Sequence, residues 1–259
     1  MAKKFIPYAE LNENQRALVD SEFYLERQDA AKLGFGLDKL ASDPYESVRA
    51  EVARQGYALD KLVNDEDWYV RRAVAEQGYA LDKLVDDEHE FVRGEVARQG
   101  YGLDKLVDDP HKSVRAAVAM QGYGLDKLVN DEHPWVRRAV AEHGYGLEIL
   151  VEDEDHDVRA EVARQGYALD KLVDDESWVV RYEVAGQDYG LDKLVNDVHA
   201  CVRMAVADQG YGLDALISDA NENVRWRAKR YLKSSGCRLS PWIAAYPDKC
   251  ALEKNRVKR

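Results

Sequence analysis

Apolar residues recur along this chain with a strict spacing of 22 positions. Within one such unit, Val70 and Val74 fall at helical spacing, and Leu81 and Leu84 repeat the pattern over a shorter stretch. The first stripe predicts a short amphipathic helix, and the second predicts a single α or 3₁₀ turn. Neither element can bury its own apolar face, so consecutive units must stack into one elongated core.

An arginine marks the same position of ten consecutive units, and from the second unit onward a valine precedes it. The ten residues are Arg27, Arg49, Arg71, Arg93, Arg115, Arg137, Arg159, Arg181, Arg203 and Arg225. A fixed period of this length is typical of stacked repeats rather than of a globular core. The sequence therefore predicts an all-α solenoid of about nine to ten two-helix repeats over residues 34–230. A helical cap with a degenerate first repeat is expected over residues 1–33, and a basic cap or tail over residues 231–259.

Recurring polar residues predict where each longer helix begins and ends. Asp65 and its equivalents suit a helix N-cap, and an acidic residue or proline usually follows. Gly78 fits the left-handed residue that closes a helix, and Tyr79 can pack back on the last turn. Asp188 takes this glycine position in one unit, where we expect a different turn geometry. Because the arginine and aspartate rows share one period, each arginine is expected to bond a carboxylate or helix-end carbonyl of an adjacent unit.

The pattern Asp-x-x-x-x-Val-Arg-x-x-Val-Ala, followed by Leu-x-x-Leu-Val, resembles the variant leucine-rich repeat and the broader HEAT-like α-solenoid group over residues 34–230. The resemblance implies a right-handed superhelix of helix pairs with a concave and a convex surface, used mostly for protein binding. One type of variant leucine-rich repeat protein holds an iron–sulfur cluster on N-terminal cysteines. The first cysteine here is Cys201, so no such cofactor is expected.

Charge is distributed unevenly along the chain. The net charge is −12, but residues 231–259 hold seven Lys/Arg against two Asp/Glu, so residues 1–230 carry −17. This acidity disfavours direct nucleic-acid binding by the repeat body, because such binding relies on Lys and Arg displacing counterions. Three cysteines, Cys201, Cys237 and Cys250, leave most of the chain without a possible disulfide. The absence of a signal-peptide pattern and of an apolar span predicts a cytoplasmic protein with no membrane partner.

Positions that differ between units are candidates for binding, because stacking fixes the others. Several of them carry aromatic side chains, which commonly anchor protein interfaces. The predicted partner-binding residues are Trp68, Tyr69, Phe91, Trp135, Trp178, Tyr182 and Trp226. The competing interpretation is that the tryptophans cover seams between neighbouring helices.

Carboxylates also gather where one unit meets the next. Helix capping and first-turn preference account for about half of this charge. The remaining candidates for an acidic ridge are Glu66, Asp67, Glu88, Glu90, Glu132, Glu154, Asp155 and Glu176. Such a ridge could imitate a nucleic-acid backbone and inhibit a DNA- or RNA-binding enzyme, as an anti-defence (anti-CRISPR-like) protein of a phage or mobile element would. A solvated face that keeps the array soluble is the simpler interpretation.

No unique chemical site stands out from the repeats. The sequence contains no Gly-rich phosphate loop, nucleophile elbow or Ser-His-Asp arrangement, and its six histidines form no zinc-binding spacing. We therefore expect no catalytic residue, no metal and no cofactor. The leading prediction is a non-enzymatic scaffold that binds another protein, and the alternative is the acidic inhibitor.

Overall fold

The protein is an α-solenoid in which longer and shorter helices alternate along the chain. The computed structural model describes residues 5–235, so the predictions for Cys237, Cys250 and residues 236–259 lie outside the described residues. Within residues 5–235 the regular structure is helical, apart from one isolated bridge between Ile6 and Phe35. The all-α repeat fold predicted from the 22-residue period is confirmed.

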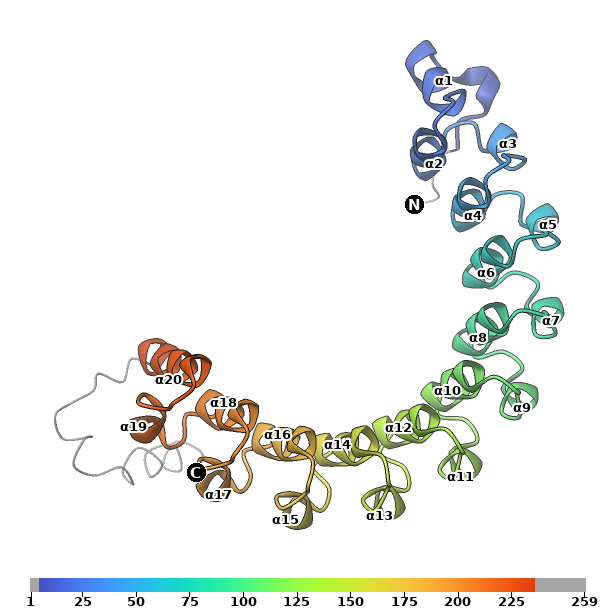
Figure 1. Ribbon diagram of the computed structural model, residues 1–259. Coiled ribbons are helices and arrows are strands. Elements are labelled where there is room, and N and C mark those ends of the chain that lie inside the picture. Colours follow the sequence, from blue (N-terminus) through green and yellow to red (C-terminus); the bar gives the residue numbers. More distant parts are fainter. Residues whose placement is uncertain (1–4, 236–259) are drawn as a thin grey trace, which may run out of the picture. The chain divides into compact units, whose positions relative to one another are not determined.

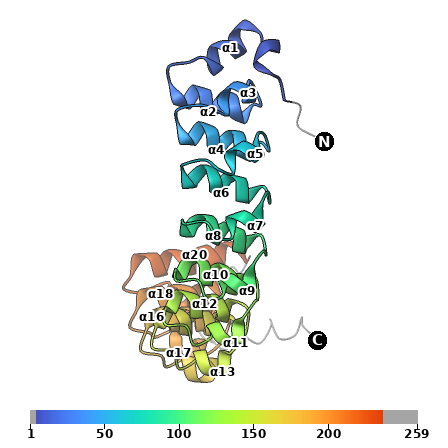
Figure 2. The same cartoon turned by 90° about the vertical axis from the view of Figure 1, so that its right-hand side faces the viewer.

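The structure divides into two compact halves, Met1–Leu128 and Val129–Arg259, which are called the first unit and the second unit. Elsewhere a unit means one 22-residue repeat. The longer helices of the first unit are α1 (Glu13–Val19), α2 (Tyr24–Lys32), α4 (Glu46–Arg54), α6 (Trp68–Glu76), α8 (Glu90–Arg98) and α10 (Lys112–Met120). Its shorter helices are η1 (Tyr8–Glu10), α3 (Leu37–Leu40), α5 (Leu59–Leu62), α7 (Leu81–Leu84), α9 (Leu103–Leu106) and α11 (Leu125–Leu128). Helices α2, α4, α6, α8 and α10 each pack on their neighbours in this series, and Figure 2 shows α2, α4, α6 and α8 stacked in succession.

The second unit repeats the same arrangement. Its longer helices are α12 (Pro134–Glu142), α14 (His156–Arg164), α16 (Trp178–Gly186), α18 (Ala200–Asp208) and α20 (Glu222–Ser234). Its shorter helices are α13 (Leu147–Leu150), α15 (Leu169–Leu172), α17 (Leu191–Leu194) and α19 (Leu213–Leu216). Within each half of the structure the longer helices form one layer and the shorter helices form a second layer beside it (Figure 1).

The core is built from the same repeat positions in every unit. Val70 and Val74 are fully buried, and Leu84 of the following short helix is 1% exposed. Burying a Val or Leu side chain contributes about 1.5–3 kcal/mol, and each unit buries several. Because these side chains contact neighbouring units, the stability of one unit depends on the next.

The helix-ending motif is the Schellman type predicted from Gly78 and Tyr79. Gly78 has a φ of 68°, its N–H donates to the Ala75 carbonyl at 2.8 Å, and the N–H of Tyr79 reaches the Val74 carbonyl at 3.5 Å. Asp188 takes the same left-handed conformation with a φ of 60°. The different backbone conformation expected at Asp188 is therefore not found, since aspartate tolerates this region.

A second left-handed residue begins each four-residue α-helix, two positions after the first. Gly102 holds it with a φ of 62°, whereas Ala80 holds the equivalent position with a φ of 50°. A Cβ added at Gly102 would lie 2.6 Å from Cγ2 of Val85. Glycine suits this position, and alanine occupies it at a conformational cost.

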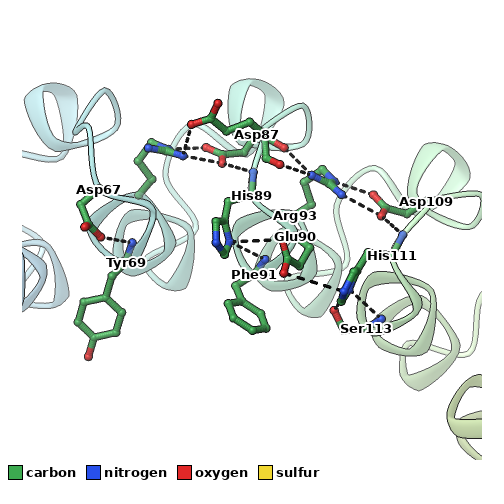
Figure 3. Close-up of polar contacts among 12 residues, drawn as sticks. Asp67, Tyr69, Asp87, His89, Glu90, Phe91, Arg93, Asp109, His111 and Ser113 are labelled. Carbon is green, nitrogen blue, oxygen red and sulfur yellow. Dashed lines mark hydrogen bonds and ion pairs between the residues drawn. The ribbon is translucent and has the colours of Figure 1, made fainter.

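The arginine and aspartate rows form a ladder between units, as predicted. Nε of Arg93 donates to Asp109 at 2.6 Å and Nη2 donates to the other carboxylate oxygen at 3.0 Å. Nη1 of Arg93 donates to the carbonyls of Asp87 and Glu88 at 2.8 and 3.1 Å (Figure 3). The hydrogen bonds with Asp109 outweigh burial and raise the pKa of Arg93. This bidentate pairing, which joins one unit to the next, gives the arginine row a structural role.

The predicted N-cap at Asp65 is wrong by two residues. Helix α6 begins at Trp68, and its cap is Asp67, whose carboxylate accepts the N–H of Tyr69 at 2.8 Å. Asp65 instead accepts the N–H of Asp67 at 3.0 Å and the guanidinium of Arg49. The aspartate thus shapes the turn before the helix, because its carboxylate is held by the preceding unit's arginine.

Candidate functional site

Most recurring polar residues are used in bonds between units. Besides the Arg–Asp ladder, three glutamines that follow longer helices donate across the interface between repeats to the carbonyl 23 residues earlier. In the second unit these pairs are Gln165 with Glu142 (3.4 Å), Gln187 with Arg164 (3.0 Å) and Gln209 with Gly186 (3.0 Å). These recurring residues are therefore explained by stacking, which leaves the positions that vary as candidates for function.

Two arginines at a variable position also join units. Arg72 lies 3.5 Å from the carboxylates of both Glu76 and Glu95, and Glu95 is 7% exposed. In the second unit Arg138 lies 3.7 Å from Glu161, which is 2% exposed. Tyr182 and Trp226 hold the same repeat position as these arginines, but they carry aromatic rings there.

In the first unit, three predicted aromatic residues gather at the starts of α6 and α8. The indole of Trp68 lies 5.2 Å from the ring of Phe91 and 5.8 Å from that of Tyr69, measured between ring centroids. Phe91 is 43% exposed, whereas Trp68 and Tyr69 are half-buried. In Figure 3 the rings of Tyr69 and Phe91 point away from the Arg–Asp ladder. The structure thus brings these three side chains into one cluster.

Tyr69 is held by a neighbouring guanidinium. Arg54 of α4 lies 4.9 Å from the centroid of the Tyr69 ring, and its Nε donates to Glu76 at 3.0 Å. Burial opposes the charge of Arg54, but hydrogen bonds with Tyr69 and Glu76 outweigh it and raise the pKa of this arginine. Arg54 is therefore a fixed cation that partly covers one ring of the cluster.

In the second unit, the four predicted aromatic residues lie on three helices. Trp135 of α12 is 49% exposed, Trp178 of α16 is 39% exposed, and Trp226 of α20 is 56% exposed. Tyr182 of α16 is half-buried. Arg230 lies 5.2 Å from the Trp226 ring centroid. These side chains offer separate apolar anchors along the unit.

The seam interpretation holds for part of this set. The indole of Trp68 stacks on the imidazole of His89 at 4.3 Å, and Trp178 stacks on His199 at 4.1 Å. Each pair joins the start of one longer helix to the start of the next. Trp68 and Trp178 therefore contribute to packing between units. Phe91, Trp135 and Trp226 keep about half of their surface exposed.

The predicted acidic ridge separates into three kinds of carboxylate. Asp67 and Asp155 cap α6 and α14. Glu90 lies 3.7 Å from Nδ1 of His89 and 3.9 Å from Nε2 of His111, and a backbone hydrogen bond, followed by these imidazoles, lowers its pKa. The third kind is the glutamates that follow the ladder aspartates, namely Glu66, Glu88, Glu132, Glu154 and Glu176.

These last glutamates differ in their surroundings from other carboxylates at the unit boundary. The side chains of Glu88, Glu154 and Glu176 are 87–90% exposed and lie 3.4–3.7 Å from a ladder arginine. The acidic residues one position before the ladder aspartates pair instead with lysines of the following unit, as Asp86 does with Lys105. Ion pairs with lysines and arginines therefore neutralise much of the negative charge that the sequence indicates at the boundary between repeats.

Some exposed residues in the same repeat positions were missed by sequence reasoning. Tyr24 and Tyr45 are 39% and 46% exposed and stack at 4.9 Å. They lie in register with Trp68 and Asp67, so the period itself could have identified them. A row of exposed carboxylates on the short helices was also missed, and it includes Asp60, Asp82, Asp104, Asp126, Asp170 and Asp192.

Neither a metal site nor a spanning helix is found in the part of the chain that the structure describes. Among residues 5–235, no group of three or more His, Cys, Asp or Glu side chains is placed to hold a metal ion. No helix there is long and apolar enough to cross a membrane. Cys201 is a free, half-buried thiol.

Comparison with models of known protein families finds no match to this chain, and comparison with curated proteins finds none either. The candidate site is therefore defined by the geometry of the repeats alone.

Proposed function

We propose that this protein is a non-enzymatic scaffold that binds another protein through the variable aromatic residues of its longer helices. The observation that supports the proposal is that recurring and variable positions of each repeat make different kinds of contact. Recurring polar residues bond one unit to the next, whereas Phe91, Trp135 and Trp226 expose 43–56% of their surface at positions that differ between units. The resemblance to variant leucine-rich and HEAT-like repeats, which mostly bind proteins, agrees with this function.

The exposed rings are large enough to supply useful binding energy. An aromatic side chain buries about 150–250 Å² when fully covered, so covering an exposed half removes about 100 Å² from water. At about 25 cal/mol per Å², each ring contributes about 2.5 kcal/mol of favourable free energy. Two such anchors account for a large part of a micromolar affinity of about −8 kcal/mol. We further propose that the scaffold works in the cytoplasm.

The experiment is affinity capture from a bacterial lysate with the purified chain, washed at low and then at high salt. A partner held by aromatic anchors stays bound at high salt, because hydrophobic contacts are not screened. Loss of the same partner with Phe91→Ala, Trp135→Ala and Trp226→Ala, at unchanged helicity, is expected. Unchanged capture by this variant contradicts the proposal.

The alternative proposal is an acidic inhibitor of a DNA- or RNA-binding enzyme. The observation in its favour is the set of glutamates that remain 87–90% exposed beside the ladder, Glu88, Glu154 and Glu176. A charge-driven contact weakens steeply with ionic strength, so its partner elutes at high salt. Replacing Glu66, Glu88, Glu132, Glu154 and Glu176 by glutamine should abolish inhibition. Full inhibition by that variant excludes the acidic mechanism.

A further inference from the structure

Histidine caps the start of four of the longer helices, always at the same repeat position. In each case Nδ1 of the imidazole accepts the backbone N–H of the residue two positions later. The pairs are His89 with Phe91 (3.3 Å), His111 with Ser113 (3.4 Å), His133 with Trp135 (3.2 Å) and His199 with Cys201 (3.3 Å). An imidazole accepts at Nδ1 only when that nitrogen carries no proton, so each of these caps requires a neutral ring with its proton on Nε2.

Other repeats use caps that do not depend on histidine. Ser177 accepts the N–H of Val179 at 3.3 Å, and Asn221 accepts the N–H of Asn223 at 2.9 Å. The repeat therefore tolerates either kind of cap at this position. Histidine gives a pH-dependent version of a bond that serine or asparagine makes at any pH.

The histidine caps touch the aromatic residues of the candidate site. The N–H groups held by His89 and His133 belong to Phe91 and Trp135, two of the predicted partner-binding residues. The ring of His89 also stacks on Trp68, and His199 stacks on Trp178. A change in these imidazoles therefore acts directly on the rings that the proposed function uses.

We propose that the four histidine caps make this surface pH-sensitive: neutral imidazoles fix the helix starts that carry Phe91 and Trp135, and protonation releases them. The effect on a partner rests on the proposed function, whereas the effect on the caps does not.

The carboxylates around the imidazoles attract the protonated rings and so partly offset the loss of each cap. Glu90 lies between His89 and His111, and His111 also contacts the hydroxyl of Ser113 at 2.7 Å. The backbone N–H groups of the four histidines donate to Asp87, Asp109, Asp131 and Asp197, and Lys112 and Glu132 are adjacent in sequence. The Asp87, Asp109 and Asp197 carboxylates are also bonded to ladder arginines.

The balance of these effects favours the neutral cap. Loss of a cap lowers the equilibrium constant for forming the helix start by roughly fivefold. The helix dipole disfavours a cation there and lowers this constant by about two- to fivefold more. The half-buried ion pair between a protonated His89 and Glu90 restores at most about fivefold in the same equilibrium constant. The stabilisation from each cap is therefore present while the ring is neutral and is lost when the ring is protonated.

The test is a pH titration of the full chain by NMR, with ¹⁵N-labelled histidine and backbone. The four capping rings should show the Nε2–H tautomer above about pH 7.5. As they protonate, the amide signals of Phe91, Ser113, Trp135 and Cys201 should move with the same midpoint and exchange roughly fivefold faster after correction for intrinsic rates. The amides of Val179 and Asn223 should stay unchanged and act as internal controls. An Nδ1–H tautomer at neutral pH, or equal responses of capped and control amides, overturns the proposal.

Variants separate the caps from their effect on binding. His89→Asn with His133→Asn copies the cap of Asn221 and should remove the pH response of the Phe91 and Trp135 amides. His156→Asn is the matched control, because His156 lies in the first turn of α14, whose cap is Asp155. With a captured partner, the wild-type chain should lose affinity between pH 7.5 and 5.5 by about fivefold or more, and the double variant should not. Equal loss in both chains overturns the link to binding, even where the amide titration supports the caps.

Discussion

The Arg–Asp ladder is expected to be the main polar contribution to stacking, and Asp109→Ala tests it. Two hydrogen bonds from Arg93 reach this carboxylate at 2.6 and 3.0 Å, and a third comes from the N–H of His111 at 2.8 Å. The Asp109 and Arg93 side chains are 4% and 15% exposed, so solvent screening is small.

The expected cost follows from leaving a buried cation without its carboxylate. Removing one partner of a buried ion pair costs about 3–5 kcal/mol. Arg93 keeps its bonds to the carbonyls of Asp87 and Glu88, which places the expected loss near about 3–4 kcal/mol. This is a large share of an ordinary total stability of about 5–15 kcal/mol.

Urea unfolding followed by circular dichroism measures the loss, and hydrogen exchange locates it in α8 and α10. Asp104→Ala is the matched control, because Asp104 is exposed on a short helix and its loss should change stability by less than about 0.5 kcal/mol. Arg93→Met combined with Asp109→Leu should cost less than the two single changes together. If Asp109→Ala lowers the free energy of unfolding by no more than about 1 kcal/mol beyond the control, the Arg–Asp ladder is not a main source of stability.

Two further predictions concern backbone conformation and pH. Gly102→Ala should destabilise the fold by about 1–2 kcal/mol in thermal unfolding, whereas Ala80→Gly at the equivalent position should be neutral or stabilising. If both changes lower the free energy of unfolding, or both raise it, the left-handed assignment is contradicted. Hydrogen bonding from Arg203 lowers the pKa of Asp219, so its stabilisation is present above the unfolded value near about 3.9 and is lost as pH falls further. Asp219→Asn should therefore flatten the stability profile below about pH 4 in acid titrations followed by circular dichroism, and an unchanged acid limb excludes this contribution.

The features predicted well from the sequence are those that recur with the period. The interior positions, the Schellman ends at Gly78 and Tyr79, and the pairing of the arginine and aspartate rows all follow from one 22-residue pattern. Repetition makes these predictions robust, because each unit must satisfy the same contacts with its neighbours.

The features missed depend on contacts that one unit makes with another. Asp65 was predicted as the cap, and only the bond from Arg49 shows that the preceding repeat holds its carboxylate. Ala80 has a left-handed backbone conformation, which the sequence would have indicated only if this residue were glycine. The caps formed by His89 and its equivalents were overlooked because imidazole is an uncommon cap.

The central claim is that recurring residues hold the repeats together while variable aromatic residues bind a partner. The most direct measurement is the affinity of a captured partner for two double-alanine variants whose replaced aromatic residues have similar exposed fractions. One replaces Phe91 and Trp135, and the other replaces Tyr101 and Tyr145, which belong to the recurring row and are each 42% exposed. We expect the affinity to fall by at least about tenfold per variable residue and to change little for the recurring pair, at unchanged helicity. Equal losses, or a loss confined to the tyrosine pair, would contradict it.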